Sequence, residues 1–563
     1  MNAPAPLDPA APWPERSASH LLVSSSQMAA LEQALFASGL PVEALMEKAA
    51  LAVVAALRGS WWPHLERHGA LVLVGPGHNG GDGLVIAREL HLAGIATAIW
   101  SPMAPHKPLT AAHLRHGEWL GLSLTPETPD PASPALWIDA LLGIGQNRAP
   151  EPALQQLLKA REQQRPACLV AVDVPTGIHA DSGHTLGHTS ATAHTTYTLG
   201  LIKRGLVQDR ALAAVGRLER IDLGLPAQLL QTLPAETPLG LSHAAGAAEL
   251  ARPWPRLDPA AGKYERGRLL VIAGSEAYRG AAHLALLGAS ASGLGSLRAC
   301  LPRSVAQALW QVLPHAVLQR SLACGPGGGL RLGQLRATDF ERLDAVLLGP
   351  GIGSLDGPQN EPQQGAPPRL HDGAQDDAQE DAQDGAEAEA WGLLQAFQGL
   401  LLLDADGLNR IDLAWLQGRQ GATWITPHAG EFGRLFADLA GQTPLDAAPA
   451  AARRSGCVVL LKGARSVVAA PDGRCWQLLQ ACPEAARAGL GDVLAGYAAG
   501  RGALGLAASQ TAAQVASQTA VQTVAAANPA WLAAAALQHA QAAFMNPGDR
   551  SPAAIAQTLN AYG

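Results

Sequence analysis

Short runs of uniformly hydrophobic residues alternate with longer amphipathic stretches along most of the chain. Such runs are typical of strands in a parallel sheet that helices cover on both faces, and the stretches between them are typical of those helices. In the first half, the pattern predicts helices over 26–39, 45–57 and 82–94 and strands over 71–75, 97–100, 135–143 and 168–177. In the second half, it predicts strands over 268–274, 344–351, 400–407, 422–430 and 457–463, and an alanine-rich helical segment over 503–527. The expected fold class is therefore α/β.

The domain organisation follows from length and punctuation. At 563 residues the chain is too long for one hydrophobic core, so we expect two domains, over residues 21–231 and 243–563, joined by a proline- and glycine-punctuated linker over 232–242. Residues 1–20 are proline-rich and lack the basic and apolar regions of a signal peptide, which predicts a disordered tail. Residues 355–389 are acidic and rich in Gln, Pro and Gly, which predicts a disordered surface insertion or, alternatively, an acidic interaction arm.

Composition and charge narrow the classes of partner. Charged residues make up 15% of the chain and hydrophobic residues 48%, which is typical of a soluble globular protein. The net charge of −7 and the lack of a basic cluster argue against a nucleic-acid partner. No apolar run approaches the roughly 20 residues needed to cross a membrane. The six cysteines are scattered without a CxxC pair, so we expect neither a zinc site nor a disulfide framework, and we expect a cytoplasmic location.

A glycine-rich segment over 75–83, GPGHNGGDG, follows one predicted strand and leads into a helix. Ligands bind at such junctions in open α/β sheets, and glycines let backbone amides approach a pyrophosphate closely. Asp139 and Asp173 end two further predicted strands, so we expect them to converge on one rim with Asn79 and Thr176. These oxygen donors suit a hard cation or a hydroxylated substrate, although either carboxylate could instead cap the following helix.

Four motifs, GPGHNGGDG, IDALLGIG, VDVPTG and TYTLGLIKRG, occur in this order over about 200 residues, after LMEKAA near position 45. Together they resemble the signatures of the NAD(P)H-hydrate epimerase domain, a Rossmann-like domain of three α/β/α layers that interconverts the R and S forms of hydrated NADH and NADPH. The resemblance implies a potassium ion bound by Asn79, Asp139 and Thr176, and catalysis by Asp173 with assistance from Lys203. The residues implied to bind the dinucleotide are His78, Asn79, Gly80, Gly81, Asp82, Gly143, Ile144, Gly145, Gln146, Asn147, Arg148, Ala149 and Asp173. His78 and Ile144 depart from the family pattern, which usually has an asparagine and a small hydroxyl residue there.

The second predicted domain contains a glycine turn, Gly489-Leu490-Gly491-Asp492, that leads into an apolar helix. Such a helix start offers free N–H groups and the positive end of the helix dipole, and it therefore binds anions. A carboxylate there would repel a phosphate, so Asp492 indicates a base or a contact to a substrate hydroxyl beside a transferring phosphoryl group. The alternative is that Asp492 only caps the helix.

Other motifs also end predicted strands of this domain. They are GSEAYRGAA over 274–282, GPGIG over 349–353, LDADGLN over 403–409, TPHAGEF over 426–432 and LKGARS over 461–466. The glycine–alanine helix start at 278–282 permits close approach of a ligand, or else only tight packing of the helix on the sheet. His428, with Glu431 three residues later, is well placed for contact with substrate or metal-bound water.

These motifs and the GLGD turn resemble, in content and order, the ADP-dependent NAD(P)H-hydrate dehydratase family, whose fold is ribokinase-like. The resemblance covers about 300 residues and implies that Asp492 is the catalytic base. The residues implied to contact the hydrated substrate are Ala282, Gly351, Gly353, His428 and Asp492. Those implied to contact the nucleotide are Lys462, Gly463, Ala464, Arg465, Ser466 and Gly491. It also implies Mg²⁺ on the diphosphate of ADP, reached by Glu431 directly or through water. Leu490 departs from the family pattern, which more often has Ser or Thr.

Together the resemblances imply a bifunctional repair enzyme that epimerises hydrated NADH and NADPH and dehydrates the S form, converting ADP to AMP and phosphate. They also imply a homo-oligomer, since these families commonly associate. One alternative is that the second domain is a kinase of a small alcohol, such as a vitamin or a sugar. Another is that the first domain is a non-catalytic module that binds nucleotides or proteins.

Overall fold

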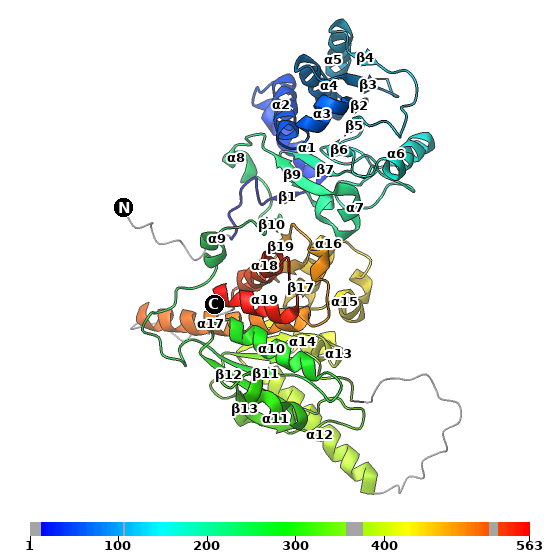
Figure 1. Cartoon of the computed structure of the whole chain (residues 1–563). Helices are drawn as coiled ribbons and strands as arrows, with labels where there is room; N and C mark the ends of the chain where they lie inside the picture. The colour runs from blue at the N-terminus through cyan, green and yellow to red at the C-terminus, as the bar shows by residue number, and fades with distance from the viewer. Residues whose placement is uncertain (1–12, 105–106, 356–374, 517–526, 563) are drawn as a thin grey trace, which may run out of the picture. The chain divides into compact units, whose positions relative to one another are not determined.

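The computed structural model describes residues 13–104, 107–355, 375–516 and 527–562 (Figure 1). It separates into two compact units. The N-terminal unit comprises Pro14–Gly240, and the C-terminal unit comprises Trp13 and the described residues from Leu241 onward. Each unit contains an open, largely parallel sheet with helices packed on it, so the predicted two-domain α/β fold is confirmed.

The N-terminal unit is built on a seven-stranded sheet with the order β4-β3-β2-β5-β6-β7-β9. All neighbouring strands in this sheet run parallel. The strands are β2 (Ala70–Val74), β3 (Thr97–Trp100), β4 (Ser123–Leu124), β5 (Leu136–Ala140), β6 (Leu169–Val172), β7 (Thr195–Leu199) and β9 (Arg217–Ile221). A separate parallel pair joins β1 (Leu22–Val23) to β8 (Ile202–Lys203).

Helices connect these strands. They are α1 (Ser25–Ala37), α2 (Val42–Ser60), α3 (Trp62–His68), α4 (His78–Leu92), α5 (Pro108–Trp119), α6 (Pro152–Gln164), α7 (Leu212–Val215) and α8 (Ala227–Leu230). The predicted helices over 26–39 and 45–57 correspond to α1 and α2. The third begins at His78, four residues before the predicted start at 82, so part of the glycine-rich segment is helical.

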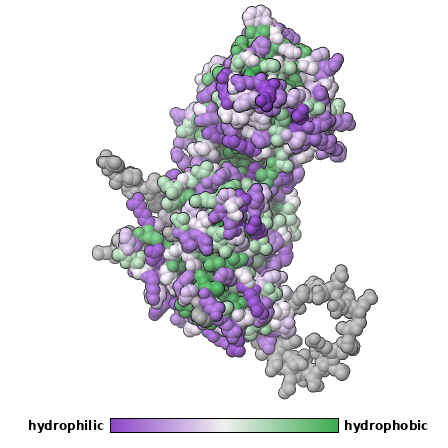
Figure 2. All heavy atoms as spheres, in the orientation of Figure 1, coloured by the Kyte–Doolittle hydropathy of each residue, from purple (hydrophilic) through white to green (hydrophobic). Residues whose placement is uncertain are grey.

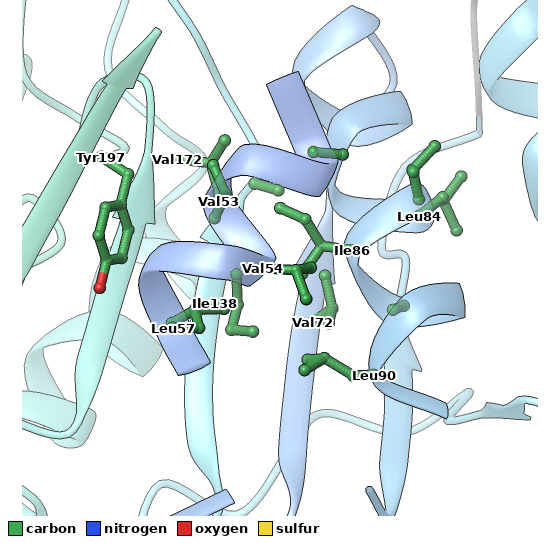
Figure 3. Close-up of a cluster of buried hydrophobic side chains, with 14 of the residues drawn as sticks. Val53, Val54, Leu57, Val72, Leu84, Ile86, Leu90, Ile138, Val172 and Tyr197 are labelled. Carbon is green, nitrogen blue, oxygen red and sulfur yellow. The ribbon is translucent and has the colours of Figure 1, made fainter. Parts of the chain in front are cut away.

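The core of this unit explains why its central strands are hydrophobic at every position. In β2, Val72 and Val74 pack in a cluster with side chains of α2 and α4, whereas Leu71 and Leu73 belong to a second cluster that includes residues of α6. Figure 3 shows side chains of α2 and α4, among them Leu57, over the strands. Successive residues of a strand point to opposite faces, so burial of both faces requires an uninterrupted hydrophobic run.

The C-terminal unit has a ten-stranded sheet with the order β10-β19-β18-β17-β16-β15-β14-β11-β12-β13. Neighbouring strands run parallel over the part of the sheet that contains β17, β16, β15, β14, β11, β12 and β13. The strand β18 pairs antiparallel with both β17 and β19. The strands are β10 (Leu239–Leu241), β11 (Arg268–Ile272), β12 (Ser296–Pro302), β13 (Val317–Leu322), β14 (Ala345–Leu348), β15 (Leu400–Leu403), β16 (Thr423–Ile425), β17 (Val458–Leu461), β18 (Val467–Ala469) and β19 (Cys475–Leu478).

The helices of the C-terminal unit complete its α/β pattern. They are α9 (Ala247–Ala251), α10 (Arg279–Ala291), α11 (Arg303–Val312), α12 (Gln375–Ala396), α13 (Asp406–Asn409), α14 (Leu413–Gln417), α15 (Ala429–Leu435), α16 (Pro444–Ser455), α17 (Leu490–Ala516), α18 (Pro529–Met545) and α19 (Pro552–Leu559). The predicted alanine-rich helix corresponds in part to α17, and residues 517–526 of that prediction lie outside the described residues.

Two segments that were expected to be disordered are partly ordered. Of the expected tail, residues 1–12 lie outside the described residues, but Trp13 is buried and Arg16 donates hydrogen bonds to backbone carbonyls of residues 233–235. Of the expected insertion, residues 356–374 lie outside the described residues, but residues 375–389 belong to α12. There Glu387 accepts hydrogen bonds from the backbone N–H groups of Leu332 and Gly333, which attaches the helix to the unit.

The surface in Figure 2 shows hydrophilic and hydrophobic residues interspersed on the face in view. The large hydrophobic side chains that are exposed are Leu51, Leu92, Trp119, Leu124, Tyr264, Tyr278, Val312, Val317, Leu318 and Met545. Within the described ranges, the helices are too short or too polar to pass through a lipid bilayer. All six cysteines are free thiols.

Candidate active sites

The strand order of the N-terminal unit reverses between β2 and β5. The loops that follow these two strands diverge, which leaves a crevice at the carboxyl ends of the strands where ligands bind in open α/β folds. A pocket of about 560 Å³ lies there. Of the predicted site residues, its lining includes His78, Asn79, Asp82, Asp173 and every residue from Gly143 to Ala149.

Two of the predicted dinucleotide contacts, Gly80 and Gly81, are absent from the pocket lining, and their contact with the dinucleotide stays a prediction. A Cβ on Gly80 would lie 1.9 Å from the backbone oxygen of Gly75, and a Cβ on Gly81 would lie 2.6 Å from the terminal carbon of Met46. Both glycines therefore permit the close packing of α4 on its neighbours, and neither contributes to the described pocket lining.

Asp139 and Thr176 form a hydrogen-bonded pair at the carboxyl end of β5. The Thr176 hydroxyl donates to Asp139 Oδ1 and the Thr176 N–H donates to Oδ2, both at 2.8 Å. Burial raises the pKa of Asp139 to about 6, against the opposing effect of these hydrogen bonds. Thr176 Oγ1 also accepts from the N–H of Leu142 (3.3 Å). This carboxylate is therefore buried, and the loop after β5 connects it to the pocket.

Asn79 lies against that same loop. A Cβ on Gly143 would be 3.3 Å from the Asn79 Cβ. Both Oδ1 and Nδ2 of Asn79 are buried and have no hydrogen-bond partner within the described part of the chain. Buried polar atoms are normally satisfied, so the unpartnered amide indicates a ligand that the protein alone does not supply. The amide oxygen, with the buried Asp139–Thr176 pair nearby, fits a hard cation.

Asp173 and Lys203 form an ion pair at the pocket. Lys203 is buried and also donates to the backbone oxygen of Leu199 (2.6 Å) and to Thr198 Oγ1 (3.2 Å). Asp173 lines the pocket and has φ +66°, a left-handed conformation that is uncommon outside glycine. Lys203 is absent from the described lining, and its ammonium group contacts the Asp173 carboxylate, so the role predicted for it stays a prediction.

Three more carboxyl groups line this pocket, Asp82 from α4, Glu32 from α1 and Glu151, which precedes α6. Burial raises the pKa of Asp82 well above its usual value, and Asp173 and Glu32 raise it further while Lys203 lowers it. Burial also raises the pKa of Glu32 to about 7, with a further increase from Asp173 and a decrease from Lys203. Sequence reasoning missed Glu32, because a glutamate on an amphipathic helix carries no signal that separates it from a solvated one.

The two departures from the epimerase pattern lie in the pocket lining. Burial, and to a lesser extent Lys107, lower the pKa of His78, which favours a neutral ring. Ile144 packs against a hydrophobic cluster that includes Val174 and Ile178. Ile144 therefore makes a hydrophobic contact with the core at a position where the family pattern usually has a small hydroxyl residue.

In the C-terminal unit, the strand order reverses between β11 and β14. The loops after these strands touch, because the N–H of Gly274 donates to the backbone oxygen of Pro350 (2.8 Å). The N–H of Gly353 donates to Asp406 Oδ2 (2.9 Å), which joins the GPGIG loop to the first residue of α13. The motifs after β11, β14 and β15 therefore meet at one edge of the sheet.

Ala282 and Gly351 pack closely at this edge. Ala282 is fully buried, and a Cβ on Gly274 would lie 2.8 Å from the Ala282 Cβ. A Cβ on Gly351 would lie 2.6 Å from that of Ala281. The side chain of Ala282 thus holds α10 against the loop after β11, and a substrate contact there involves the backbone of this helix start.

Asp404, Lys462 and Asp492 form a charged cluster at the carboxyl ends of β15 and β17. Lys462 Nζ donates to Asp404 Oδ1 (2.6 Å), and Thr426 Oγ1 donates to the same oxygen (2.7 Å). Burial lowers the pKa of Lys462, but the carboxylates of Asp404, Glu431 and Asp492 outweigh it and the pKa is raised. Burial raises the pKa of Asp492 to about 7, with Asp404 adding to the increase and Lys462 opposing it. A carboxylate with such a pKa is suited to act as a base near neutral pH.

Asp492 is the third residue of α17, so the GLGD motif already includes the first helical turn. The carboxylate of Asp492 forms no hydrogen bond with any described residue, so it does not cap the helix. The N–H groups of a first turn have no partner within the helix, which leaves them available to an anion. A Cβ on Gly491 would lie 3.6 Å from Lys462 Nζ. The first turn of α17 and Lys462 therefore create a positive electrostatic potential beside Asp492.

His428 caps α15. Its Nδ1 accepts from the N–H of Gly430 (2.9 Å) and Glu431 (3.4 Å), and Glu431 Oε2 accepts from the N–H of His428 (2.9 Å). The His428 side chain remains 60% exposed, whereas that of Glu431 is 6% exposed. Burial raises the pKa of Glu431, against the opposing charge of Lys462. His428 is thus accessible to a substrate while it orders the loop that carries Glu431.

The KGARS segment forms the turn between β17 and β18. The N–H of Lys462 donates to the backbone oxygen of Pro427 (2.9 Å), and the N–H of Gly463 donates to Ser466 Oγ (3.3 Å). Gly463 and Ala464 are exposed, and Arg465 is buried. Lys462 is the member of this segment that enters the charged cluster, and nucleotide contacts by the others remain a prediction.

Comparison with known proteins places the chain in a family. Residues 42–205 match the family described as YjeF-related protein N-terminus, and residues 269–546 match NAD(P)H-hydrate dehydratase. The chain is 40% identical to the bifunctional NAD(P)H-hydrate repair enzyme Nnr of Gloeobacter violaceus, over 84% of this chain and 87% of the relative. The chain belongs to the family of bifunctional NAD(P)H-hydrate repair enzymes. The first match lies in the N-terminal unit and the second in the C-terminal unit, so both resemblances drawn from the motifs are confirmed.

The chain is also similar to another family member and, over part of its length, to solved structures. The family member from Synechocystis is 37% identical over 85% of each chain. The ADP/ATP-dependent NAD(P)H-hydrate dehydratase from Bacillus subtilis, co-crystallized with ATP/Mg²⁺, is 23% identical with a TM-score of 0.38 and covers 56% of this chain and 96% of its own. A ribokinase-like superfamily protein from Enterococcus faecalis is 19% identical with a TM-score of 0.41 and covers 56% of this chain and 94% of its own.

Proposed function

We propose that this chain repairs hydrated NADH and NADPH in two steps. The N-terminal unit interconverts the R and S forms, and the C-terminal unit dehydrates the S form while it converts ADP to AMP and phosphate. The two activities complement each other, because a dehydratase that accepts one epimer leaves the other unless an epimerase returns it. The six free cysteines are consistent with activity in the reducing cytoplasm, where we place it.

Dehydration begins at Asp492. The hydrated ring carries a hydroxyl on C6, and hydroxide is a poor leaving group. The Asp492 carboxylate removes the hydroxyl proton as the oxygen attacks the β-phosphorus of ADP, and AMP departs. The phosphate ester then breaks at its C6–O bond, the ring nitrogen supplies the electron pair, and loss of a proton from C5 restores the ring double bond. Lys462 and the free N–H groups at the start of α17 stabilise charge on the transferring phosphoryl group.

Epimerisation takes place at the Asp173 pocket. The C6 carbon carries both a hydroxyl and the ring nitrogen, and the electron pair of that nitrogen allows the C6–O bond to break and to re-form on the other face. Asp173 lies at the pocket with its carboxylate oriented by Lys203 and by the N–H of Leu199 (3.2 Å). In this position it can exchange a proton with the hydroxyl or with the water that replaces it.

The residues present fit the cations that the family resemblance implies. For K⁺, the unpartnered amide oxygen of Asn79 and the buried oxygens of Asp139 and Thr176 would be the ligands. For Mg²⁺ on the diphosphate, the buried carboxylate of Glu431 is the protein group that would reach it. When bound, such cations supply fixed positive charge next to anionic groups.

The observation that carries the proposal is Asp492, held without a hydrogen-bond partner among the described residues beside Lys462 and the first turn of α17. To test it, we would incubate the purified protein with an equilibrated mixture of R- and S-hydrated NADH and either ADP or ATP. Recovery of NADH absorbance beyond the S fraction, with release of AMP and phosphate from ADP, is expected. Accumulation of a stable phosphorylated substrate without NADH would support the small-alcohol kinase instead. Recovery that stops at the S fraction would contradict the epimerase assignment.

A further inference from the structure

Glu32 belongs to the epimerase pocket although it lies far from its motifs in the sequence. It lines the same cavity as Asp82 and Asp173, and no hydrogen bond of its carboxyl group to a described residue is found. The same cavity contains the unpartnered amide of Asn79. A partly buried acid that has no hydrogen-bond partner among the described residues, in the same cavity as the unpartnered Asn79 amide, is placed to contact a ligand bound there.

The helix that carries Glu32 is held firmly. Ser24 and Gln27 form a capping box at the start of α1. Asp181 accepts hydrogen bonds from the N–H (2.5 Å) and the hydroxyl (2.9 Å) of Ser25, which ties the helix to the loop that follows β6. Glu32 is therefore presented by a rigid element, as a group that transfers protons requires.

Charged and titratable groups on several other elements share the pocket with Glu32 or lie close to it, among them His78, Arg148 and Glu151. Asp82 lies on α4, Asp173 follows β6, and Lys203 lies on β8. Lys203 forms an ion pair with Asp173, whereas Glu32 forms no ion pair with any described residue. With a pKa raised to about 7, Glu32 is protonated in a large fraction of molecules at neutral pH, which is the state a proton donor needs.

We propose that Glu32 is a second catalytic residue of the epimerase site and that it forms, with Asp173, an acid–base pair serving the two faces of the hydrated ring. This inference rests on the epimerase activity proposed above.

The reaction balances as follows. The Glu32 acid gives its proton to the C6 hydroxyl, the C6–O bond breaks, water is released, and the ring nitrogen supplies an electron pair to form a C6=N1 iminium. Water adds to C6 from the other face and gives a proton to the Asp173 carboxylate, which yields the opposite epimer. The reverse reaction starts from protonated Asp173 and ends with protonated Glu32. Transfer of the proton between the two carboxyl groups returns the site to its starting state.

The test measures R-to-S and S-to-R exchange by chiral chromatography, without nucleotide, for the full chain and for Glu32→Gln. Glutamine keeps the shape of the side chain but cannot donate as an acid. We expect exchange to slow about 100-fold, within the range for loss of a general acid or base, and by the same factor in both directions. The wild-type rate should fall as pH rises through about 7, and the variant should lack this decline. Glu66→Gln, at an exposed position on α3, is the matched control and should match the wild type.

Four results would overturn the inference. If Glu32→Gln exchanges the epimers within twofold of the wild type, Glu32 has no catalytic role. If the variant exchanges the epimers slowly but keeps the wild-type pH profile, the role of Glu32 is structural. If Glu32→Gln fails to fold, as judged by its thermal transition, Glu32→Asp replaces it. The aspartate variant should retain part of the rate with a shifted pH midpoint, and an unshifted midpoint would refute the role. Lack of exchange in the wild type would refute the proposed epimerase itself, and the inference with it.

Discussion

Replacing Asp492 by Asn tests the proposed dehydration step most directly. The substitution preserves size and removes the ability to accept a proton. The side chain has no hydrogen bond to a described residue, so the change breaks no contact of that kind. The fold should therefore survive, and any loss of dehydration reports on chemistry.

The magnitude follows from the surroundings of Asp492. Its pKa is raised to about 7, so about a tenth of the molecules carry the base at pH 6 and about nine tenths at pH 8. The wild-type kcat/KM for the pure S substrate should therefore fall about tenfold per pH unit below about 7. Loss of a general base typically costs 10²- to 10⁴-fold, or about 3–5 kcal/mol of transition-state stabilisation. The Asn variant should lose this factor at pH 8 together with the acidic decline.

The assay follows NADH absorbance from the pure S substrate with ADP between about pH 5.5 and about pH 8.5. This range brackets the expected midpoint of the pH profile. Asp438→Asn removes a carboxylate that is exposed on the surface and serves as the control. Exchange between R and S should persist in Asp492→Asn, because Asp173 lies in the other unit. Dehydration by Asp492→Asn within threefold of wild type at pH 8 would refute the role of Asp492 as base, and loss of both activities in a folded variant would refute the division of labour.

Further substitutions, around Asp492, in the Asp173 pocket and in the hydrophobic core, have the following expected outcomes. Asp404→Asn removes a negative charge that raises the pKa of Asp492, so the acidic midpoint of kcat/KM should move below about 7; an upward shift would contradict the electrostatic account. Asp492→Asn should raise stability in urea at pH 8 by up to about 4 kcal/mol, because raising that pKa from 3.8 to about 7 costs the folded state about 1.4 kcal/mol per pH unit. The gain should almost vanish near about pH 3, where the group is largely protonated in both the folded and the unfolded state, and equal gains at both pH values would be inconsistent with this cause. Asp173→Asn should abolish epimer exchange and spare dehydration of the S form, and chiral chromatography would reveal any retained exchange. Leu57→Ala, in the core of Figure 3, should cost about 2–5 kcal/mol of unfolding free energy, and a loss below 1 kcal/mol would mean that the site relaxes.

Much of the fold was predictable because parallel strands buried on both faces leave a continuous hydrophobic signature. The runs that contain Val72 and Leu402 correspond to strands β2 and β15, and the carboxylates after such runs lie at the strand ends. The reason is topological, because every parallel strand delivers the following residue to the same edge of the sheet. Site residues that follow strands, such as Asp173 and Lys462, were therefore accessible to sequence reasoning.

Features that do not follow from the position of a residue after a strand could not be predicted from the sequence. Glu32 reaches the pocket from the middle of α1, where its meaning depends on how the helix is docked and not on local pattern. The acidic, Gln-rich composition of residues 375–389 predicted disorder and gave no sign that they begin α12, whose later residues Ala390 and Leu394 pack into the unit. Gly80 and Gly81 stay predicted ligand contacts, and the sequence gave no sign of the close packing that the structure shows at both positions.

The left-handed backbone at Asp173 restricts which amino acids evolution can place there. A branched residue such as valine at φ +66° would strain the main chain by about 1–2 kcal/mol, whereas glycine, and to a lesser degree asparagine, tolerate the conformation. Saturation mutagenesis at this position should therefore test each of the twenty amino acids in two ways. One test is whether the chain folds, and the other is whether it exchanges the epimers. Only aspartate should pass both selections, while glycine and asparagine pass the first alone.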